Sequence, residues 1–104
     1  MKLSNINLPI KQLMAIQESL QAINKINNDF RSSKKIDGLQ LFKDKENNVY
    51  MSYCSHYVTG DGPDSSLEYF QIDSKGNKTN LSLVYQNKSD IALKLSRYDE
   101  ITIQ

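Results

Sequence analysis

The fold is decided by one stretch near the N-terminus, which reads LPIKQLMAIQESLQAINKINNDF from Leu8 to Phe30. Its apolar residues recur every three or four positions, at Ile10, Leu13, Ile16, Leu20, Ile23, Ile26 and Phe30. That spacing is typical of an amphipathic α-helix with one apolar side. Pro9 suits the first helical turn, where a missing N–H loses no hydrogen bond. We therefore expect one long N-terminal helix that ends between Asn28 and Ser32.

Beyond Ser33 the apolar period changes from about 3.6 residues to 2, which is the period of a half-buried β-strand. The alternating segments are residues 39–43, 49–58, 67–73, 81–85, 91–95 and 101–103. Short polar links join most of these segments, and links of that length connect antiparallel neighbours. Gly76 is the expected left-handed position of one such turn. The link from Thr59 to Ser66 is longer and predicts an exposed loop.

These elements predict an α+β fold, with the long N-terminal amphipathic helix packed on one face of a five- to six-stranded antiparallel meander sheet. We expect residues 1–104 to form a single α+β domain, because 104 residues is an ordinary domain size. The predicted core comprises Leu13, Ile16, Leu20, Ile23, Phe30, Leu41, Val49, Met51, Tyr53, Leu81, Leu83, Leu93 and Leu95. A single helix can cover only one sheet face, so we expect the opposite face to be open.

Composition argues against several classes of protein. Thirteen basic and twelve acidic residues leave a net charge of +1, which favours neither a nucleic-acid nor a membrane partner. No apolar run approaches the roughly 20 residues that span a bilayer, and the N-terminus lacks the apolar segment of a signal peptide. The single cysteine, Cys54, cannot form an internal disulfide. We therefore expect a protein of a reducing cytoplasm, with no nucleic acid and no membrane as partner.

His56 is the only histidine and follows Cys54 by two positions on the same expected strand. A thiol and an imidazole can form a nucleophile–base pair. Residues two apart on a strand face are roughly 7 Å apart at Cα, however, which is too far for easy hydrogen bonding. A zinc site needs three or four ligands, and the chain has only two Cys or His residues. We therefore expect no metal and no cofactor, and we expect His56 to be a surface residue.

Five residues are candidates for contact with a partner protein: Tyr50, His56, Tyr57, Asp61 and Asp64. Tyrosine is enriched in protein–protein interfaces, and long polar loops often carry recognition. The two aspartates do not make a calcium loop of the EF-hand type. Counted from Asp61, Pro63 stands at the third position and Ile72 at the twelfth, where oxygen ligands are required.

No Gly-rich phosphate loop, GxSxG elbow, HExxH or CxxC motif is present in the sequence. We therefore expect a non-enzymatic protein-binding module. Small size and a lack of motifs are typical of bacterial or phage inhibitors, of the immunity or anti-defence type, that neutralise a toxin or a host enzyme. The alternative is a small metal-independent ribonuclease or toxin-like enzyme. In that case His56, with Tyr57, Lys94 and Arg97, supplies acid–base groups and a cation.

Two further possibilities concern association and ligands. Edge strands at Leu39–Lys43 or Ile101–Ile103 expose unpaired backbone groups, so they can pair between two chains and form a homodimer. A small-ligand pocket between helix and sheet requires a cavity of a few hundred Å³. We disfavour such a pocket because the predicted apolar residues fill the core.

Overall fold

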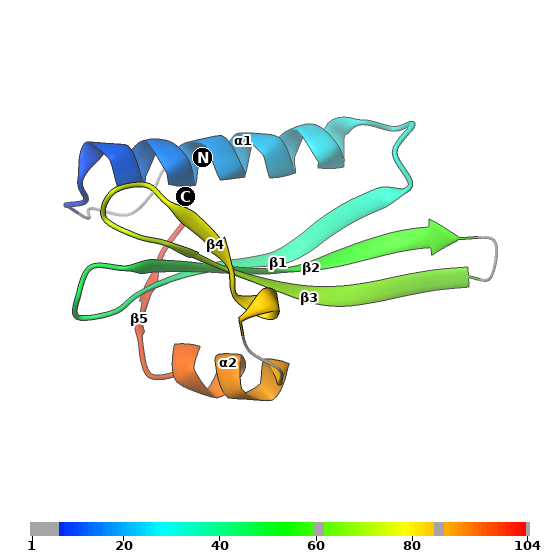
Figure 1. Ribbon diagram of the computed structural model, residues 1–104. Coiled ribbons are helices and arrows are strands. Elements are labelled where there is room, and N and C mark those ends of the chain that lie inside the picture. The colour runs from blue at the N-terminus through cyan, green and yellow to red at the C-terminus, as the bar shows by residue number, and fades with distance from the viewer. Residues whose placement is uncertain (1–6, 60–61, 85–86, 104) are drawn as a thin grey trace.

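Five antiparallel strands form one sheet in the order β4-β3-β2-β1-β5, and a helix lies on each side of it (Figure 1). The computed structural model describes residues 7–59, 62–84 and 87–103, with the backbone alone for residues 58, 59, 62 and 63. Its elements are α1 (Ile10–Asn28), β1 (Lys34–Lys43), β2 (Val49–Thr59), β3 (Gly62–Ile72), β4 (Lys78–Asn80), the 3-10 turn η1 (Leu81–Leu83), α2 (Lys88–Leu95) and β5 (Asp99–Ile101). This confirms the predicted α+β fold with a long N-terminal helix on an antiparallel sheet.

Helix α1 covers one face of the sheet, which we call the helix face. Ile16, Leu20 and Ile23 are buried on α1 and form a core with strand residues that include Leu41 and Met51. The prediction that Phe30 belongs to this core is wrong, since its side chain is 89% exposed. The reason is that α1 ends at Asn28, so Phe30 no longer follows the helical period.

The turn between β1 and β2 and the turn between β3 and β4 have the same construction, and we call them the near-end turns. In each, one carboxylate oxygen of the first aspartate, Asp44 or Asp73, accepts from two backbone N–H groups further along the turn. The fourth residue of each turn is left-handed, with φ of 64° at Asn47 and 86° at Gly76. The prediction of a left-handed turn at Gly76 is therefore confirmed.

The predicted strands at residues 81–85 and 91–95 are wrong over their described residues, 81–84 and 91–95. Residues 81–83 form η1 and residues 88–95 form α2, while residues 85 and 86 lie outside the described residues. The side chain of Asn87 accepts a hydrogen bond from the Ser89 N–H at 2.9 Å, and Asp90 lies in the first turn. Both features stabilise a helix N-terminus, so local capping outweighs the alternating pattern.

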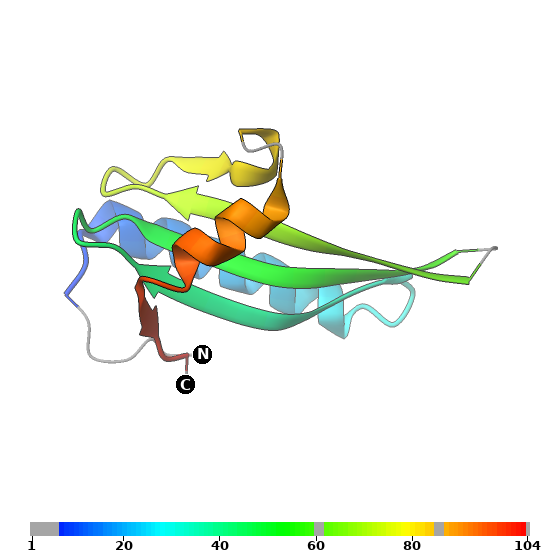
Figure 2. The same ribbon diagram turned by 90° about the horizontal axis from the view of Figure 1, so that it is seen from below.

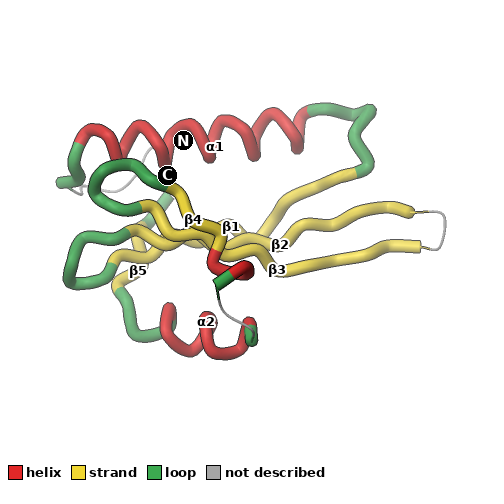
Figure 3. The backbone as a smooth tube through the Cα atoms, in the orientation of Figure 1, coloured by secondary structure: helices red, strands yellow, loops and turns green. Residues whose placement is uncertain are grey.

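Helix α2 packs on the second sheet face, which we call the reverse face (Figures 2 and 3). A second core forms beneath it, made of Tyr50, Tyr69, Leu81, Ile91 and Leu95. Leu83 and Leu93, predicted as core, are 85% and 59% exposed. Ile91 and Leu95 are four residues apart and share the buried side of α2. Leu93 lies two residues from each and therefore points away from that side.

The expectation of a wholly open reverse face is therefore wrong. The part of the reverse face that lies beyond α2 stays uncovered. The β2–β3 hairpin extends well beyond α2 (Figure 1). The predicted loop from Thr59 to Ser66 is also wrong, because β3 begins at Gly62 and pairs with Thr59. Pairing between β2 and β3 therefore extends as far as Thr59 and Gly62, and this lengthens the uncovered part of the sheet.

The sheet edges differ from the prediction in one respect. Residues 41–43 pair with β2 on one side and with β5 on the other, so this part of the predicted Leu39–Lys43 edge is interior. Strand β5 (Asp99–Ile101) is the edge there, close to the predicted Ile101–Ile103 segment. Neither of the two described helices is long and apolar enough to cross a membrane.

Candidate functional site

The candidate site is the uncovered part of the reverse face, which we call the distal face. It comprises Asp37, Cys54, His56, Ser65 and Leu67. Strand register places Asp37 opposite Cys54 and Ser65 opposite His56. Directly opposite residues in an antiparallel pair share a face, with Cβ atoms about 5 Å apart. Three strands thus bring a carboxylate, a thiol, an imidazole and a hydroxyl together.

A β-bulge places Asp37 on this face. Asp37 and Leu41 are four residues apart, so both would point to the helix face in a regular strand. The β1–β2 register shifts between Asp37 and Gln40, and this extra residue reverses the alternation. Gly38 supplies the left-handed conformation that such a bulge uses, with φ of 65°. The bulge therefore turns Asp37 away from α1 and toward the imidazole of His56.

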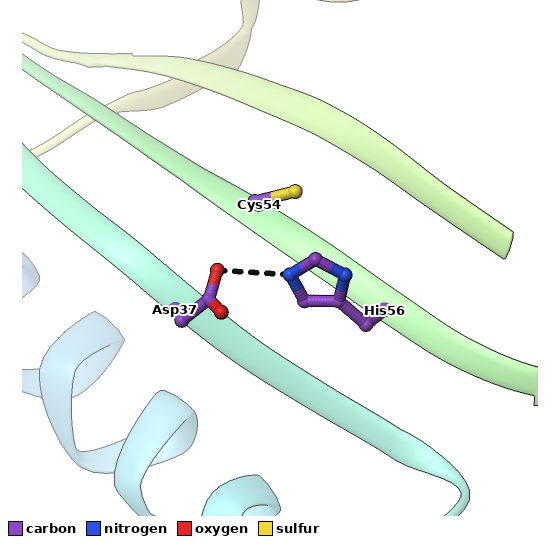
Figure 4. A group of neighbouring side chains, drawn as sticks. All are labelled: Asp37, Cys54 and His56. Atoms are coloured by element: carbon purple, nitrogen blue, oxygen red, sulfur yellow. Dashed lines mark hydrogen bonds and ion pairs between the residues drawn. The ribbon is translucent and has the colours of Figure 1, made fainter. Parts of the chain in front are cut away.

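The imidazole of His56 contacts both neighbouring strands, and Figure 4 shows its contact with Asp37 on β1. Its Nε2 lies 2.9 Å from Oδ1 of Asp37, and its Nδ1 lies 2.7 Å from Oγ of Ser65. The side chain of His56 is 40% exposed and that of Asp37 is 70% exposed. The ring orientation is thus fixed on both sides while the group stays open to solvent.

Cys54 completes a group of three possible ligands. Its Sγ, a ring nitrogen of His56 and a carboxylate oxygen of Asp37 all lie within 4.8 Å of one another. The thiol and the imidazole therefore approach more closely than the backbone spacing suggested. Asp37 is missed when only Cys and His are counted as ligands. Gly38 after an alternating segment was the available signal, because a glycine inside a strand often marks a bulge.

The structure separates the five predicted contact residues. His56 lies on the distal face, whereas Tyr57 and Asp64 pair across β2 and β3 on the helix-face side, where both are exposed. Asp61 lies outside the described residues. Tyr50 is only 5% exposed and donates from its hydroxyl to Asp44 at 2.8 Å, so it is not available for contact. Burial raises the pKa of Tyr50, and the neighbouring Asp44 carboxylate raises it further.

The four residues suggested for a ribonuclease do not gather at one place. Tyr57 points to the opposite face from His56. Arg97 lines a hollow together with Lys43 and Glu46, beside the turn at the other end of β2. Lys94 is exposed on α2. A phosphate held by His56 would therefore not meet the cation of Arg97.

A hollow of about 310 Å³ lies between α2 and the sheet, next to the distal face. Its lining includes Phe42, Tyr69 and Leu95, together with Ser52, which precedes Cys54 by two positions on the same face. Exposed apolar side chains occur on the elements around it. They are Leu67 at 48%, Leu83 at 85%, Val84 at 63% and Leu93 at 59% exposure.

No protein-family model matches this sequence, and no curated protein or solved structure matches the chain.

Proposed function

We propose that this protein is a non-enzymatic binding module that neutralises another protein by docking through the distal face and the hollow beside it. The occupant is a folded protein, such as a toxin or a host enzyme, that presents an apolar side chain to the hollow. A bacterial or phage inhibitor of the immunity or anti-defence type fits this role. Its place is the reducing cytoplasm, where Cys54 stays reduced.

The observation that carries the proposal is the exposure of apolar side chains on three elements that form or border the uncovered part of the sheet, which are β3, η1 and α2. Leu67 stands on the distal face itself, and Leu83 and Leu93 stand on η1 and α2. Exposed apolar groups that gather around a concave site mark protein-interaction surfaces more often than isolated ones do. Interfaces are also anchored by a few apolar or aromatic side chains that fill well-packed pockets. The hollow lined by Phe42 and Tyr69 offers such a pocket.

The test compares one charge substitution at two exposed apolar positions. Leu67→Asp alters the distal face, and Met14→Asp alters an exposed residue of α1 on the other side of the sheet. Immobilised wild type and Met14→Asp should retain the same stoichiometric protein from cells that carry this gene, and Leu67→Asp should not. The retained protein, once purified, should lose its activity when one equivalent of the wild-type chain is added.

Three results contradict the proposal. One is that no protein is retained in stoichiometric amount. Another is that Leu67→Asp retains the protein as well as the wild type does. The third is a retained protein whose activity is unchanged by the wild-type chain, because binding without inhibition does not fit a neutralising role.

A ribonuclease or toxin-like activity is the second candidate, and the contacts of His56 favour it. A histidine held between a carboxylate and a hydroxyl resembles the arrangement with which enzymes activate a hydroxyl group. Purified protein should then cleave RNA without added metal, and His56→Ala should abolish the cleavage. Absence of cleavage by the wild type, or equal cleavage by His56→Ala, eliminates this candidate.

A further inference from the structure

We propose that Asp37, Cys54 and His56 bind a zinc ion on the distal face. The three side chains offer a carboxylate oxygen, a sulfur and an imidazole nitrogen, all within 4.8 Å of one another. Zinc accepts this mixture of donors, and three protein ligands leave a fourth position for water. The site does not depend on the proposed docking of a partner, because all three ligands belong to this chain.

A zinc ion requires the thiol, which lies within 4.8 Å of the other two ligand atoms, to move closer by up to about 1.3 Å. Zinc bonds of about 2.0 Å to nitrogen and oxygen and about 2.3 Å to sulfur place tetrahedral ligand atoms about 3.3–3.6 Å apart. His56 Nε2 and Asp37 Oδ1 are already 2.9 Å apart, and their contact would open slightly. Asp37 is 70% exposed, so its carboxylate can rotate without disturbing the core.

Ser65 supplies the support that a metal-bound histidine requires. A ligating imidazole almost always donates its other ring N–H to an oxygen atom, which fixes the tautomer and the ring plane. With Nε2 on the metal, Nδ1–H of His56 donates to Oγ of Ser65 across 2.7 Å. The contact between Nδ1 and Oγ is present in the structure, and the Ser65 hydroxyl, which can donate or accept, takes the accepting role once Nε2 binds the metal.

The strand framework also holds the ligands in place. Cys54 and His56 occupy alternate positions of β2, the central strand, and Asp37 is directly opposite Cys54 on β1. Ligands on paired strands are positioned more rigidly than ligands on loops. The bulge at Gly38 is what places the carboxylate beside the other two groups.

Cobalt provides the direct test, because the chain has one cysteine and a cobalt–thiolate absorption can arise only from Cys54. Reduced protein without a histidine tag is titrated with Co²⁺. We expect saturation at one Co²⁺ per chain, a thiolate-to-cobalt charge-transfer band, and loss of that band on adding one equivalent of Zn²⁺. Cys54→Ser should abolish the band.

Four further variants separate a built site from a lone thiol. His56→Ala and Asp37→Asn each remove a ligand, so each should weaken Co²⁺ binding by more than Ser65→Ala does. Ser65→Ala removes only the supporting hydrogen bond, and we expect a loss of about 10- to 100-fold. Asp64→Asn is the control, since Asp64 lies on the same hairpin but pairs with Tyr57 on the other face. It should bind Co²⁺ like the wild type.

Circular dichroism of each variant establishes that the fold is retained. The proposal is overturned if the wild type shows no thiolate–cobalt band at saturating Co²⁺. It is equally overturned if His56→Ala and Asp37→Asn, both folded, bind as tightly as the wild type, because the thiol then acts alone. A stoichiometry of one metal per two chains also overturns it, since the site would then lie between molecules.

Discussion

The side-chain amide of Asn27, on α1, pairs with the backbone of Ile36, on β1, through two hydrogen bonds. Nδ2 donates to the Ile36 carbonyl and Oδ1 accepts from the Ile36 N–H, each at 2.8 Å. At this point β1 has β2 on one side only, because β5 pairs with residues 41–43. The asparagine therefore takes the place of a neighbouring strand on an otherwise unpaired edge. Unpaired edges invite association between chains, and this one is blocked by a side chain.

Asn27→Ala should destabilise the fold and promote self-association. Two hydrogen bonds of about 1 kcal/mol each are lost, so we expect the free energy of unfolding to fall by about 1–2 kcal/mol. Urea denaturation measures this change, and light scattering detects the association. Asn24→Ala, at an exposed position of the same helix, should have little effect on either measurement. Equal behaviour of the two variants would show that the β1 edge needs no protection.

Gln12 ties α1 to both near-end turns. Its Nε2 donates to the carbonyl oxygens of Ile72 at 2.9 Å and Asn47 at 2.7 Å, and its side chain is fully buried. Gln12→Met keeps the volume but removes both hydrogen bonds, each worth about 1 kcal/mol, and it also removes the buried Oε1 of Gln12, which has no hydrogen-bond partner among the described residues. We expect a loss of about 1–2 kcal/mol in urea denaturation. Gln17→Met, on the exposed side of α1, should change stability little.

The long helix and the first hairpins could be predicted from the sequence because their apolar periods are regular. Residues 91–95 could not be assigned from the same signal, since Ile91, Leu93 and Leu95 fit a strand by alternation. The decisive information lay upstream, in the capping side chain of Asn87. Residues 91–95 fit both a helix and a strand by their apolar pattern. Their helical structure depends on the capping side chain and on packing against Tyr50 and Tyr69.

The candidate site was predicted only in part, for a geometric reason. His56 and Cys54 attract attention because they are single representatives of reactive residue types. Asp37 does not, because its side of the strand depends on a one-residue bulge at Gly38. Register errors of one residue move a side chain to the other sheet face. A site whose residues come from three strands therefore cannot be predicted from sequence spacing alone.

Acid should destabilise the fold through Asp44. Burial by itself would raise the pKa of this carboxyl, but hydrogen bonds from the Asn48 backbone, the Tyr50 hydroxyl, the Asn48 amide and the Glu46 N–H lower the pKa below its usual value. The folded pKa then lies below the unfolded one. The resulting stability is complete above about pH 4, near the unfolded value. It is lost as the pH falls through the folded pKa.

Asp44→Asn removes this dependence. At neutral pH we expect a loss of about 1.5–3 kcal/mol, typical of hydrogen bonds to a charged group. Below the folded pKa the variant and the wild type should converge. Asp73→Asn changes the more exposed copy of the same turn and should cost less stability. Urea midpoints measured from neutral to strongly acidic pH test both statements, and parallel curves for wild type and Asp44→Asn would contradict them.

Two left-handed glycines should respond differently to alanine. Gly38 has φ of 65°, and no other side chain or backbone atom lies within 4 Å of the position that a Cβ would take. Gly38→Ala should therefore cost only the backbone penalty of about 1–2 kcal/mol for a left-handed residue that carries a side chain. Gly76 has φ of 86°, and a Cβ there would lie 2.8 Å from the carbonyl oxygen of Lys11 on α1, so Gly76→Ala should cost clearly more. Thermal denaturation of the pair measures the difference, and equal losses would mean that α1 moves away freely.

The helical structure of α2 can be tested by substituting Ile91 and Leu93. In a strand Ile91 and Leu93 would share a face, whereas in a helix they point apart. Ile91 is 1% exposed and Leu93 is 59% exposed. Ile91→Ala should cost about 2–5 kcal/mol by leaving a cavity under α2, while a surface change such as Leu93→Ala should stay within about 0.5 kcal/mol.

The same pair reports on what α2 covers. Undocking of α2 in Ile91→Ala would expose Tyr50 and Tyr69, so binding of a hydrophobic dye should rise in this variant and not in Leu93→Ala. Similar destabilisation by both substitutions would favour a strand at residues 91–95 instead. In that case the reverse face would lack its helical cover near Tyr50, and the uncovered surface would extend over the whole sheet.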